Sequence, residues 1–400
     1  MSDNNKASFL QGITRLVADA TVGTTDIVES MHHRIVHPPL LPSTPIQHII
    51  TGIAGITYRN IRWTTRLIGK GIDKSLGKLG PILGDFKETP RKDSTLAVLN
   101  GILGDYLEIN NNPLAIQMKI RNQERTISID TLSQTGEISN VNGKILIMVH
   151  GSCMNDSQWT RDEHNHGLAL AEKSGHSLLF LHYNSGRHIS SNGKDFSELL
   201  EMLIETWPVP VEEITFICHS MGGLVSRSAY YYGQLSDKEW TKYCTKMIFL
   251  GTPHHGAPLE RIGNYLDTVL HTIPYTTPLS RIGKIRSAGV TDLRYGNITD
   301  EDRQSKDRFE LTGDQRIIIP LPDEVECFTI AGVTGKISDK PSFRKAGDKL
   351  VSLNSALGIH KDAEKTLEFK KANTWISEET THSDLLSNQN IYKKLVSWLS

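Results

Sequence analysis

The sequence has few cysteines and no long apolar run, and each absence excludes a class of protein. The four cysteines among the 400 residues include no pair at CxxC spacing, so neither a dithiol redox motif nor a zinc clip is indicated. Three lie in or beside apolar runs, which favours buried free thiols over disulfides. The longest apolar stretches, near Ile49–Ile56 and Leu146–Val149, are far shorter than the roughly 20 residues of a membrane-spanning helix. The polar start MSDNNKAS has no apolar core after it, so no secretory signal is expected.

An excess of charge of one sign is also lacking. The chain carries 44 basic and 45 acidic residues, for a net charge of -1, so no global field points to a nucleic acid. Hydrophobic residues make up 38% and charged residues 22%, which is typical of a protein with a sizeable core. We therefore expect a cytoplasmic protein without a nucleic-acid partner. No repeat was found, and no pattern fixes an oligomeric state.

The N-terminal part of the chain, residues 1–112, is predicted to be a helical extension. Apolar residues there recur at helical spacing, and four prolines within His37–Pro45 break the first helical stretch. A second stretch runs from about residue 46 to 79. The polar residues Lys87–Ser94 are predicted to be a loop, and Leu96–Leu107 a short helix.

The pattern changes after the turn signal Asn110–Pro113, and residues 113–400 are predicted to be a catalytic domain. Apolar strands alternate with helical segments, which predicts an α/β fold with a mostly parallel sheet covered by helices on both faces. The continuous apolar runs suit strands that are buried on both faces. These strands are predicted at 144–149, 177–183, 213–218, 246–250 and 326–331, after a hairpin of 114–120 and 125–130, with helices at 168–174, 196–206 and 222–232.

A pattern typical of a nucleophile elbow lies at Ile217–Gly223, which reads ICHSMGG. It follows an apolar strand and opens a helix, so Ser220 falls on the tight strand-to-helix turn that exposes a nucleophile. Such a turn needs small residues two positions either side of the serine. Gly222 meets this requirement, and Cys218 stands where glycine is usual. The alternative is a serine that only caps the helix, and the surrounding strand, HSMGG sequence and downstream partners favour the nucleophile.

Two backbone N–H groups are candidates for an oxyanion hole, which stabilises the negative charge that develops on a substrate carbonyl. Met221 directly follows the predicted nucleophile. Ser152 lies in the loop at 150–153 (HGSC), directly after the buried strand predicted at 144–149. The alternative for this loop is an ordinary turn that contains a glycine. The elbow further along the chain favours the oxyanion role.

The acid and the histidine of a catalytic triad are expected downstream, because this kind of fold orders its triad as Ser, then Asp or Glu, then His. His382 lies in a polar loop just before a C-terminal amphipathic helix, from which it can reach back over the sheet edge. Asp348 follows the last predicted core strand and precedes His382, and its role would be to orient the imidazole. The rival base is His360, and the rival acids are Asp384, Asp339 and Asp323.

Four motifs together resemble the GPI inositol-deacylase-like and lipase-like branch of the α/β-hydrolase superfamily. They are HSMGGLVSR from His219, GTPHHGAP at 251–258, GDKLVSLNSALG at 347–358 and THSDLL from Thr381. The resemblance covers roughly Lys144–Ser400. It implies an α/β-hydrolase fold and ester hydrolysis, often of lipids or acyl groups, without a cofactor. The N-terminal third is similar to an extension of uncharacterised bacterial lipase-like proteins, which implies no role for it.

Two further features of the catalytic domain have both ordinary and functional interpretations. Residues 257–314 are too long for a simple connection and are predicted to form a cap over the pocket. The pair His254-His255 and the cluster of Asp162, His164 and His166 contain metal-binding side chains. No third ligand is placed by spacing in either group, so no metal site is predicted.

A basic amphipathic stretch occupies residues 59–78 of the extension. Basic residues recur there every four positions, and apolar residues lie largely on the opposite side. Such a helix can rest on an anionic membrane surface, as a peripheral contact. The favoured alternative is a helix that packs on the catalytic domain and exposes its basic face to water. The basic residues are Arg62, Arg66, Lys70 and Lys74, and the apolar ones are Ile61, Ile68, Ile72 and Leu76.

The sequence as a whole predicts a serine hydrolase that cleaves small-molecule or lipid carboxylic esters through an acyl-enzyme on Ser220. An acyltransferase with the same triad is the nearest alternative, because it differs only in whether water or an alcohol resolves the acyl-enzyme. A catalytically idle scaffold, with N-terminal helices that bind a membrane or a partner, is the alternative from another class. The complete set of Ser220, Asp348 and His382 argues against it.

Overall fold

A computed structural model of the chain divides it into two compact units. One consists of Met1–Thr89 with Leu107–Ala115, and the other of Pro90–Tyr106 with Ile116–Ser400. The second unit holds the sheet and the candidate site. The structure describes residues 90–122, 125–129, 141–258, 287–302, 314–336 and 347–400, with a few positions between 11 and 63.

Several predictions made from the sequence lie outside the described residues. They are the helices predicted within residues 1–79, apart from scattered positions, together with the basic stretch at 59–78, and residues 259–286 and 303–313 of the predicted cap. These predictions, and the division of the chain at residues 112 and 113, stay predictions.

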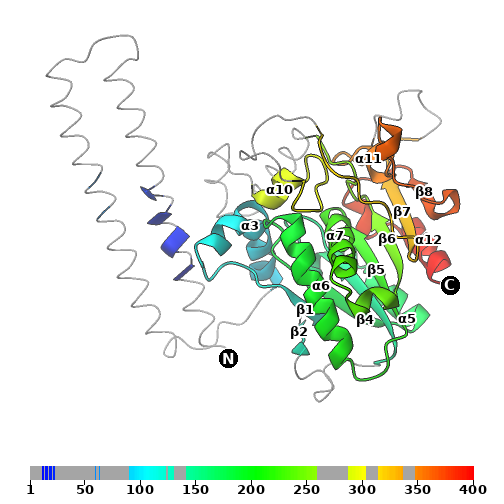
Figure 1. Cartoon of the computed structure of the whole chain (residues 1–400), viewed down its shortest axis with the longest axis horizontal. Coiled ribbons are helices and arrows are strands. Elements are labelled where there is room, and N and C mark those ends of the chain that lie inside the picture. The colour runs from blue at the N-terminus through cyan, green and yellow to red at the C-terminus, as the bar shows by residue number, and fades with distance from the viewer. Residues whose placement is uncertain are drawn as a thin grey trace, which may run out of the picture. The chain divides into compact units, whose positions relative to one another are not determined.

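An eight-stranded sheet lies at the centre of the second unit, with the strand order β2-β1-β4-β3-β5-β6-β7-β8 (Figure 1). From β4 to β8 in that order, all neighbouring strands are parallel, and β1 pairs antiparallel with β4 and with β2. The mostly parallel sheet predicted from the alternation of strands and helices is confirmed. The strands are β1 (Lys119–Asn122), β2 (Arg125–Thr126), β3 (Lys144–Val149), β4 (Ser177–His182), β5 (Glu213–His219), β6 (Cys244–Leu250), β7 (Glu326–Gly332) and β8 (Thr374–Ser377).

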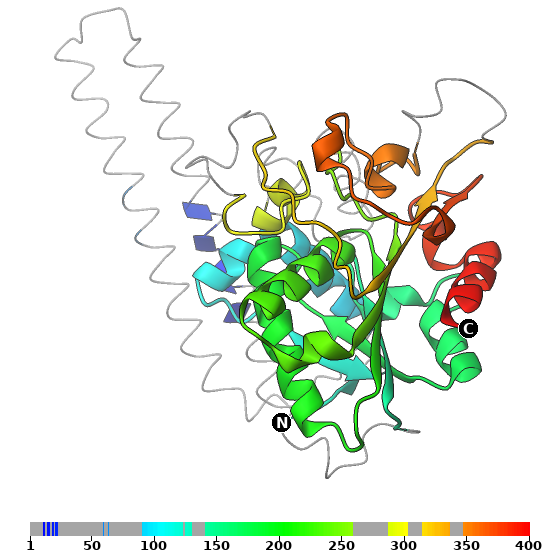
Figure 2. The same cartoon turned by 45° about the vertical axis from the view of Figure 1, so that its right-hand side comes forward.

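Helices cover both faces of this sheet (Figure 2). Alternate residues of each strand point to opposite faces. On one face Phe216 contacts Phe196 of α6, which packs against α7. On the other, Ile217 belongs to a buried apolar cluster that includes residues of α5 and α12. The helices are α3 (Pro90–Ile109), α5 (His166–Ser174), α6 (Ile189–Thr206), α7 (Met221–Leu235), α10 (Ala288–Asp292), α11 (Leu353–Ala356) and α12 (Gln389–Leu399).

The structure corrects several element boundaries. Helix α3 begins at Pro90, inside the predicted loop, because proline suits the first helical position, where no N–H partner is needed. Helix α6 begins seven residues before its predicted start at Phe196, in a polar stretch where the Asn192 amide donates to the carbonyl of Asn184. The hairpin strands predicted at 114–120 and 125–130 are shorter in the structure, where they are β1 and β2, and the short strand β8 was not predicted.

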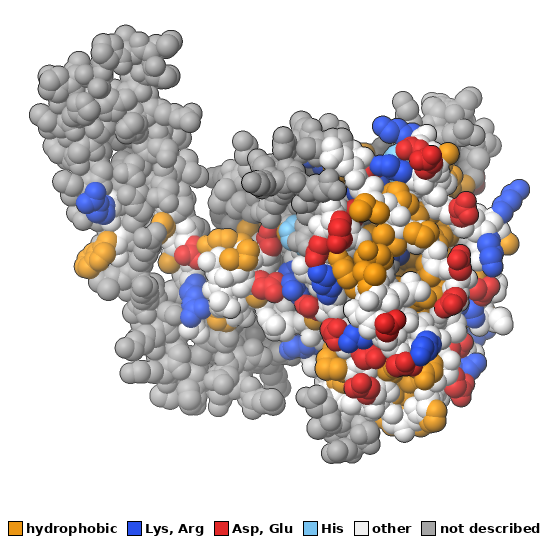
Figure 3. Space-filling view, in the orientation of Figure 1, with side chains coloured by type: hydrophobic (Ala, Val, Ile, Leu, Met, Phe, Trp, Pro, Cys, Tyr) orange, Lys and Arg blue, Asp and Glu red, His pale blue; other side chains and the backbone are white. Residues whose placement is uncertain are grey.

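The described surface carries charges of both signs. Figure 3 shows acidic and basic side chains interspersed over this face, as the near-zero net charge suggests. No helix in the described part of the chain has the length and apolar character needed to cross a membrane.

Candidate active site

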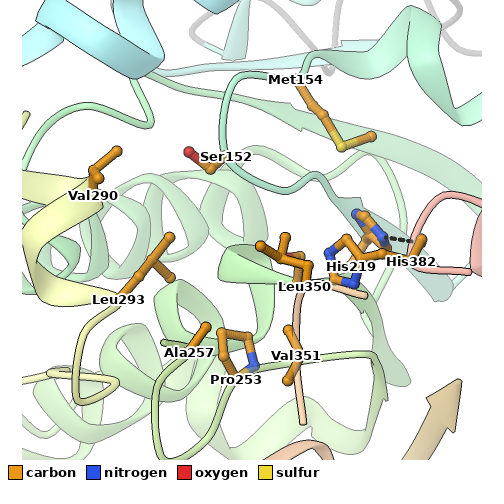
Figure 4. A pocket seen from close by; sticks show the side chains of 11 residues that line it. Ser152, Met154, His219, Pro253, Ala257, Val290, Leu293, Leu350, Val351 and His382 are labelled. Carbon is orange, nitrogen blue, oxygen red and sulfur yellow. Dashed lines mark hydrogen bonds between the residues drawn. The ribbon is translucent and has the colours of Figure 1, made fainter. Parts of the chain in front are cut away.

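The predicted site residues lie on segments that follow the carboxyl ends of parallel strands. Ser152 follows β3, Ser220 follows β5, Asp348 lies in the connection from β7 to β8, and His382 comes after β8. Parallel strands end at one edge of a sheet, so residues far apart in sequence meet there. Ser152, Ser220 and His382 line one pocket, and Figure 4 labels Ser152 and His382 in it. Asp348 contacts His382 directly.

The turn at Ser220 has the geometry of a strained elbow. Its φ of 53° and ψ of -124° lie in a region that residues with side chains rarely adopt. The carbonyl of Leu250 on β6 accepts a hydrogen bond from the Ser220 N–H at 2.9 Å, which ties the turn to the sheet. At Gly222 a Cβ would lie 2.4 Å from the Val149 carbonyl oxygen, so only glycine lets α7 start this close to β3.

Asp348 and His382 form a buried pair held by several hydrogen bonds. Nδ1 of His382 donates to Oδ2 of Asp348 at 2.6 Å, and the His382 N–H donates to the Asp348 carbonyl at 2.9 Å. The other carboxylate oxygen accepts from the N–H groups of Leu350 and Val351, at 3.0 and 2.8 Å. Every oxygen of the Asp348 side chain thus has a partner, and the carboxylate is fixed against the imidazole.

The free nitrogen of His382 lies at the pocket. Its Nε2 is buried and has no hydrogen-bond partner. Because Nδ1 donates its hydrogen to Asp348, Nε2 carries a lone pair and can accept a proton. Within the described residues no hydrogen bond links this nitrogen to the Ser220 hydroxyl, although both groups line the pocket. Catalytic hydrogen bonds are often long in the absence of substrate and tighten in the complex.

The loop at 150–153 is anchored in a way that keeps Ser152 at the pocket. The Tyr183 hydroxyl donates to the His150 carbonyl at 2.8 Å, and the Cys153 N–H donates to the Ser185 hydroxyl at 3.0 Å. Burial lowers the pKa of His150 to about 3, so this histidine is neutral at pH 7. Met221 is the first residue of α7, where backbone N–H groups have no partner within the helix.

The rest of the pocket wall is apolar. Among the described residues, only Ser152, Ser220 and two histidines contribute polar side chains to it. Three of the apolar residues come from the described part of the predicted cap: Ala257 at its first position, and Val290 and Leu293 at α10. The apolar residues are Met154, Pro253, Ala257, Val290, Leu293, Leu350 and Val351.

Comparison with known protein families decides what kind of domain this is. Residues 140–306 match the model of a family described as PGAP1-like alpha/beta domain. Its fold is that of the α/β hydrolases. The match includes β3 to β6 and the elbow at Ser220, and confirms the resemblance to the GPI inositol-deacylase-like branch. No curated protein sequence matches the chain.

Several solved structures are similar to this chain at low identity. Mature lipase BlEst2 of Bacillus licheniformis has 17% identity and a TM-score of 0.42, with 66% of this chain and 95% of that chain covered. The Pyrococcus furiosus esterase Pf2001 has 14% identity and a TM-score of 0.38, with 65% and 81% covered. A thermophilic esterase from Thermogutta terrifontis has 12% identity and a TM-score of 0.35, with 65% and 90% covered.

The described rivals for the triad positions are not among the residues that line the pocket. Nε2 of His360 is 3.5 Å from Oδ2 of Asp314, and His360 is not among the residues that line the pocket. Asp384 accepts a hydrogen bond from the N–H of Thr381 at 2.9 Å. Asp323 is exposed, and Asp339 lies outside the described residues.

The other histidine groups bind neighbouring protein atoms. His164 Nε2 and His166 Nδ1 are 2.8 Å apart, and His166 Nε2 donates to the Leu385 carbonyl at 3.2 Å. Arg316 donates to the His254 carbonyl and to Nδ1 of His255, at 3.1 and 3.3 Å. In the described part of the chain, no three His, Cys, Asp or Glu side chains are grouped as a metal site would require.

Two residues at the site were not identified from the sequence. Gly251, directly after β6, has a φ of 59°, and a Cβ there would lie 3.1 Å from Oδ2 of Asp348 and 3.2 Å from Nδ1 of His382. Its position after a buried strand was the available signal. His219 precedes the predicted nucleophile, and its Nε2 donates to the His382 carbonyl at 3.1 Å. No local pattern could indicate that bond, because its partner is 163 residues away.

Cys218 fills the small-residue position before Ser220 and is fully buried on β5. Its thiol donates to the Ser226 hydroxyl at 3.1 Å, and burial raises its pKa to about 12, so it is an unreactive thiol at pH 7. We expect Cys218→Gly to retain ester turnover within about threefold. The lost packing should lower the free energy of unfolding by about 1–2 kcal/mol.

Urea unfolding and nitrophenyl ester turnover, measured on the same preparations, check this expectation. Cys218→Ala is the matched control, because it removes the thiol and keeps a Cβ. A well-folded Cys218→Gly protein without activity would contradict the view that the cysteine only has to fit.

Proposed function

We propose that this protein is a serine hydrolase that cleaves carboxylic esters through an acyl-enzyme on Ser220. The observation that carries the proposal is the strained turn at Ser220 in a pocket with the fixed Asp348–His382 pair. The combination of a nucleophile that lines the pocket, a base with a free lone pair and an acid that orients the base is the arrangement used in acyl transfer.

In the first half of the proposed reaction, the Ser220 hydroxyl attacks the ester carbonyl. His382 Nε2 takes the hydroxyl proton, and Asp348 stabilises the imidazolium that forms. The N–H groups of Ser152 and Met221 donate to the oxyanion. The bond to the leaving alcohol then breaks, and His382 returns the proton to the alcohol oxygen. The acyl group is left on Ser220, and hydrolysis of that ester completes the cycle.

The apolar wall of the pocket supports an acyl group as the part of the substrate that enters it. Burial of an acyl chain stabilises binding by about 0.8 kcal/mol for each CH₂ group. Leu293 and Val290 of the α10 region and Leu350 beside Asp348 supply apolar contacts near Ser220. We therefore propose lipid or other acyl esters as the substrate class.

The test of this proposal is labelling of the full chain with a fluorophosphonate probe, followed by turnover of a panel of p-nitrophenyl esters from acetate to palmitate. We expect a single labelled peptide that contains Ser220, and turnover of at least one ester. Labelling at a different serine would contradict the assignment of Ser220 as the nucleophile. The absence of both labelling and turnover would refute the proposed activity.

A peripheral membrane contact through residues 59–78 is a separate proposal, supported by the spacing of basic and apolar residues in that stretch. Each basic residue near an anionic surface contributes about 1 kcal/mol, and salt screens the attraction. Such a contact predicts that the chain co-sediments with anionic vesicles at low salt. Binding should weaken with added salt, and in a variant with Arg62, Arg66, Lys70 and Lys74 all changed to Gln. No sedimentation at low salt would leave these residues a structural role only.

A further inference from the structure

Two neighbouring imidazoles in the pocket each offer an unused lone pair. The carbonyl of His382 can only accept, so the His219 Nε2 that bonds to it must carry the ring hydrogen, and Nδ1 of His219 has a lone pair. Likewise, His382 donates from Nδ1 to Asp348, which leaves the lone pair on Nε2. Figure 4 shows the two rings side by side, and their centroids are 4.7 Å apart.

Both lone pairs lack a partner in the described structure. Nδ1 of His219 and Nε2 of His382 are buried without a hydrogen bond, and both residues line the pocket beside Ser220. A buried polar atom without a partner is costly, so its presence calls for an explanation. Burial and the neighbouring His382 hold the pKa of His219 well below its usual value, and its Nδ1 therefore stays an acceptor across the neutral range.

We propose that Nδ1 of His219 and Nε2 of His382 together hold the water molecule that resolves the acyl-enzyme. This inference rests on the proposed function. A water molecule has two hydrogens to donate, and with bonds of about 2.8 Å it bridges acceptors roughly 4–5 Å apart, a span compatible with the ring separation. When both hydrogens are donated, the lone pairs of the water oxygen are left to face the acyl carbon.

The reaction step follows from this placement. The water oxygen bonds to the acyl carbon as one of its hydrogens moves to Nε2 of His382 as a proton. The other hydrogen stays on the oxygen and remains bonded to Nδ1 of His219. The bond between the acyl carbon and Oγ of Ser220 then breaks, and the proton on His382 moves to that Oγ. Ser220 is restored, and the product is the free carboxylic acid.

Gly151 keeps the space in front of this acceptor open. A Cβ at position 151 would lie 3.0 Å from Nδ1 of His219 and 3.1 Å from Cβ of Ser220. At that distance an added methyl group would occupy the approach to the nitrogen. An alanine there is therefore expected to hinder the bridging water, independently of any change in His219 itself.

The proposal distinguishes water from an alcohol as the group that attacks the acyl-enzyme. An alcohol has one hydroxyl hydrogen, which it donates to His382, and so it makes no use of His219. Loss of the Nδ1 acceptor should slow hydrolysis and spare alcoholysis. The experiment supplies p-nitrophenyl butyrate in water with added ethanol, and measures the ratio of ethyl butyrate to butyric acid.

Two variants of the full chain test the Nδ1 acceptor and the Nε2 donor of His219 separately. In His219→Gln the amide nitrogen can take the place of Nε2 and keep the bond to the His382 carbonyl, while the Nδ1 acceptor is lost. In His219→Asn the amide oxygen replaces the Nδ1 acceptor, while the donor to His382 is lost. We expect His219→Gln to raise the ratio of ethyl butyrate to butyric acid about tenfold, the effect of one hydrogen bond. We expect His219→Asn to lower the total rate and leave the ratio unchanged.

The outcomes separate the inference from the proposed function. An unchanged product ratio in a folded His219→Gln protein would overturn the inference and leave the serine hydrolase intact. If that variant does not fold, Gly151→Ala provides the test, with a raised ratio expected and an unchanged ratio against the inference. If the unaltered chain forms neither product and Ser220 is not labelled, the proposed function fails, and the inference fails with it.

Discussion

Ser220→Ala is expected to abolish ester hydrolysis, with kcat lowered by about 10^6-fold, the scale seen when the nucleophile of a serine hydrolase is removed. The hydroxyl is the group that becomes the acyl-enzyme, and neither neighbouring histidine can replace it in that step. The fold should be preserved, because serine and alanine meet the same strain at a φ of 53°. We expect the free energy of unfolding to change by less than about 1 kcal/mol.

Nitrophenyl ester turnover and fluorophosphonate labelling, with urea unfolding on the same protein, measure this result. The exposed Ser397, on α12, provides a control, and Ser397→Ala should retain full labelling and turnover. A folded Ser220→Ala protein with normal turnover would show that the chemistry takes place elsewhere in the chain.

Asp348→Asn is expected to lower kcat by about 10^4-fold, as in other triads in which this substitution leaves the geometry intact. The asparagine oxygen can still accept from Leu350 and Val351, which now bond to Oδ1 at 3.0 and 2.8 Å. Its NH₂ group then replaces Oδ2 and faces His382. Two donors cannot bond, so His382 adopts the other tautomer, with its hydrogen on Nε2, and no longer accepts a proton from Ser220.

This substitution tests the choice of acid and leaves the class of enzyme untouched. Asp384→Asn is the matched control, because Asp384 is the acid closest to His382 in sequence, and its carboxylate binds Thr381. We expect that control to retain turnover within about threefold, with any loss appearing in stability. If Asp348→Asn retained ester turnover and Asp384→Asn lost it, Asp384 would be the acid of the triad.

Much of this protein follows from local patterns in the sequence. A strand buried on both faces must be apolar along its length, and this pattern places β3, β5 and β6 within one or two residues. The alternation of these strands with helices allows little besides a parallel sheet, and the family match to residues 140–306 agrees with it. Ser220 is equally local, because the small residues that a tight elbow needs are its near neighbours in the chain.

Other features depend on contacts that no local pattern contains. The sequence left several acids open, and the return of the chain from β7 to β8 is what places Asp348 2.6 Å from His382. The start of α6 depends on an acid far away in the sequence, because the Ile189 N–H donates to Oδ2 of Asp292 at 2.9 Å. Gly251 needs its lack of a side chain only because Asp348 and His382 pack against it.

His219 illustrates this division most clearly. The sequence by itself determined the strand, the elbow and the expectation of a Ser, Asp and His set, because hydrophobic periodicity and turn chemistry are properties of neighbouring residues. Only the tertiary structure decided which nitrogen of His219 carries a hydrogen, because that depends on a carbonyl 163 residues away. Long-range contacts of this kind are made when the strands assemble, and they determine which lone pairs and which donors face the pocket.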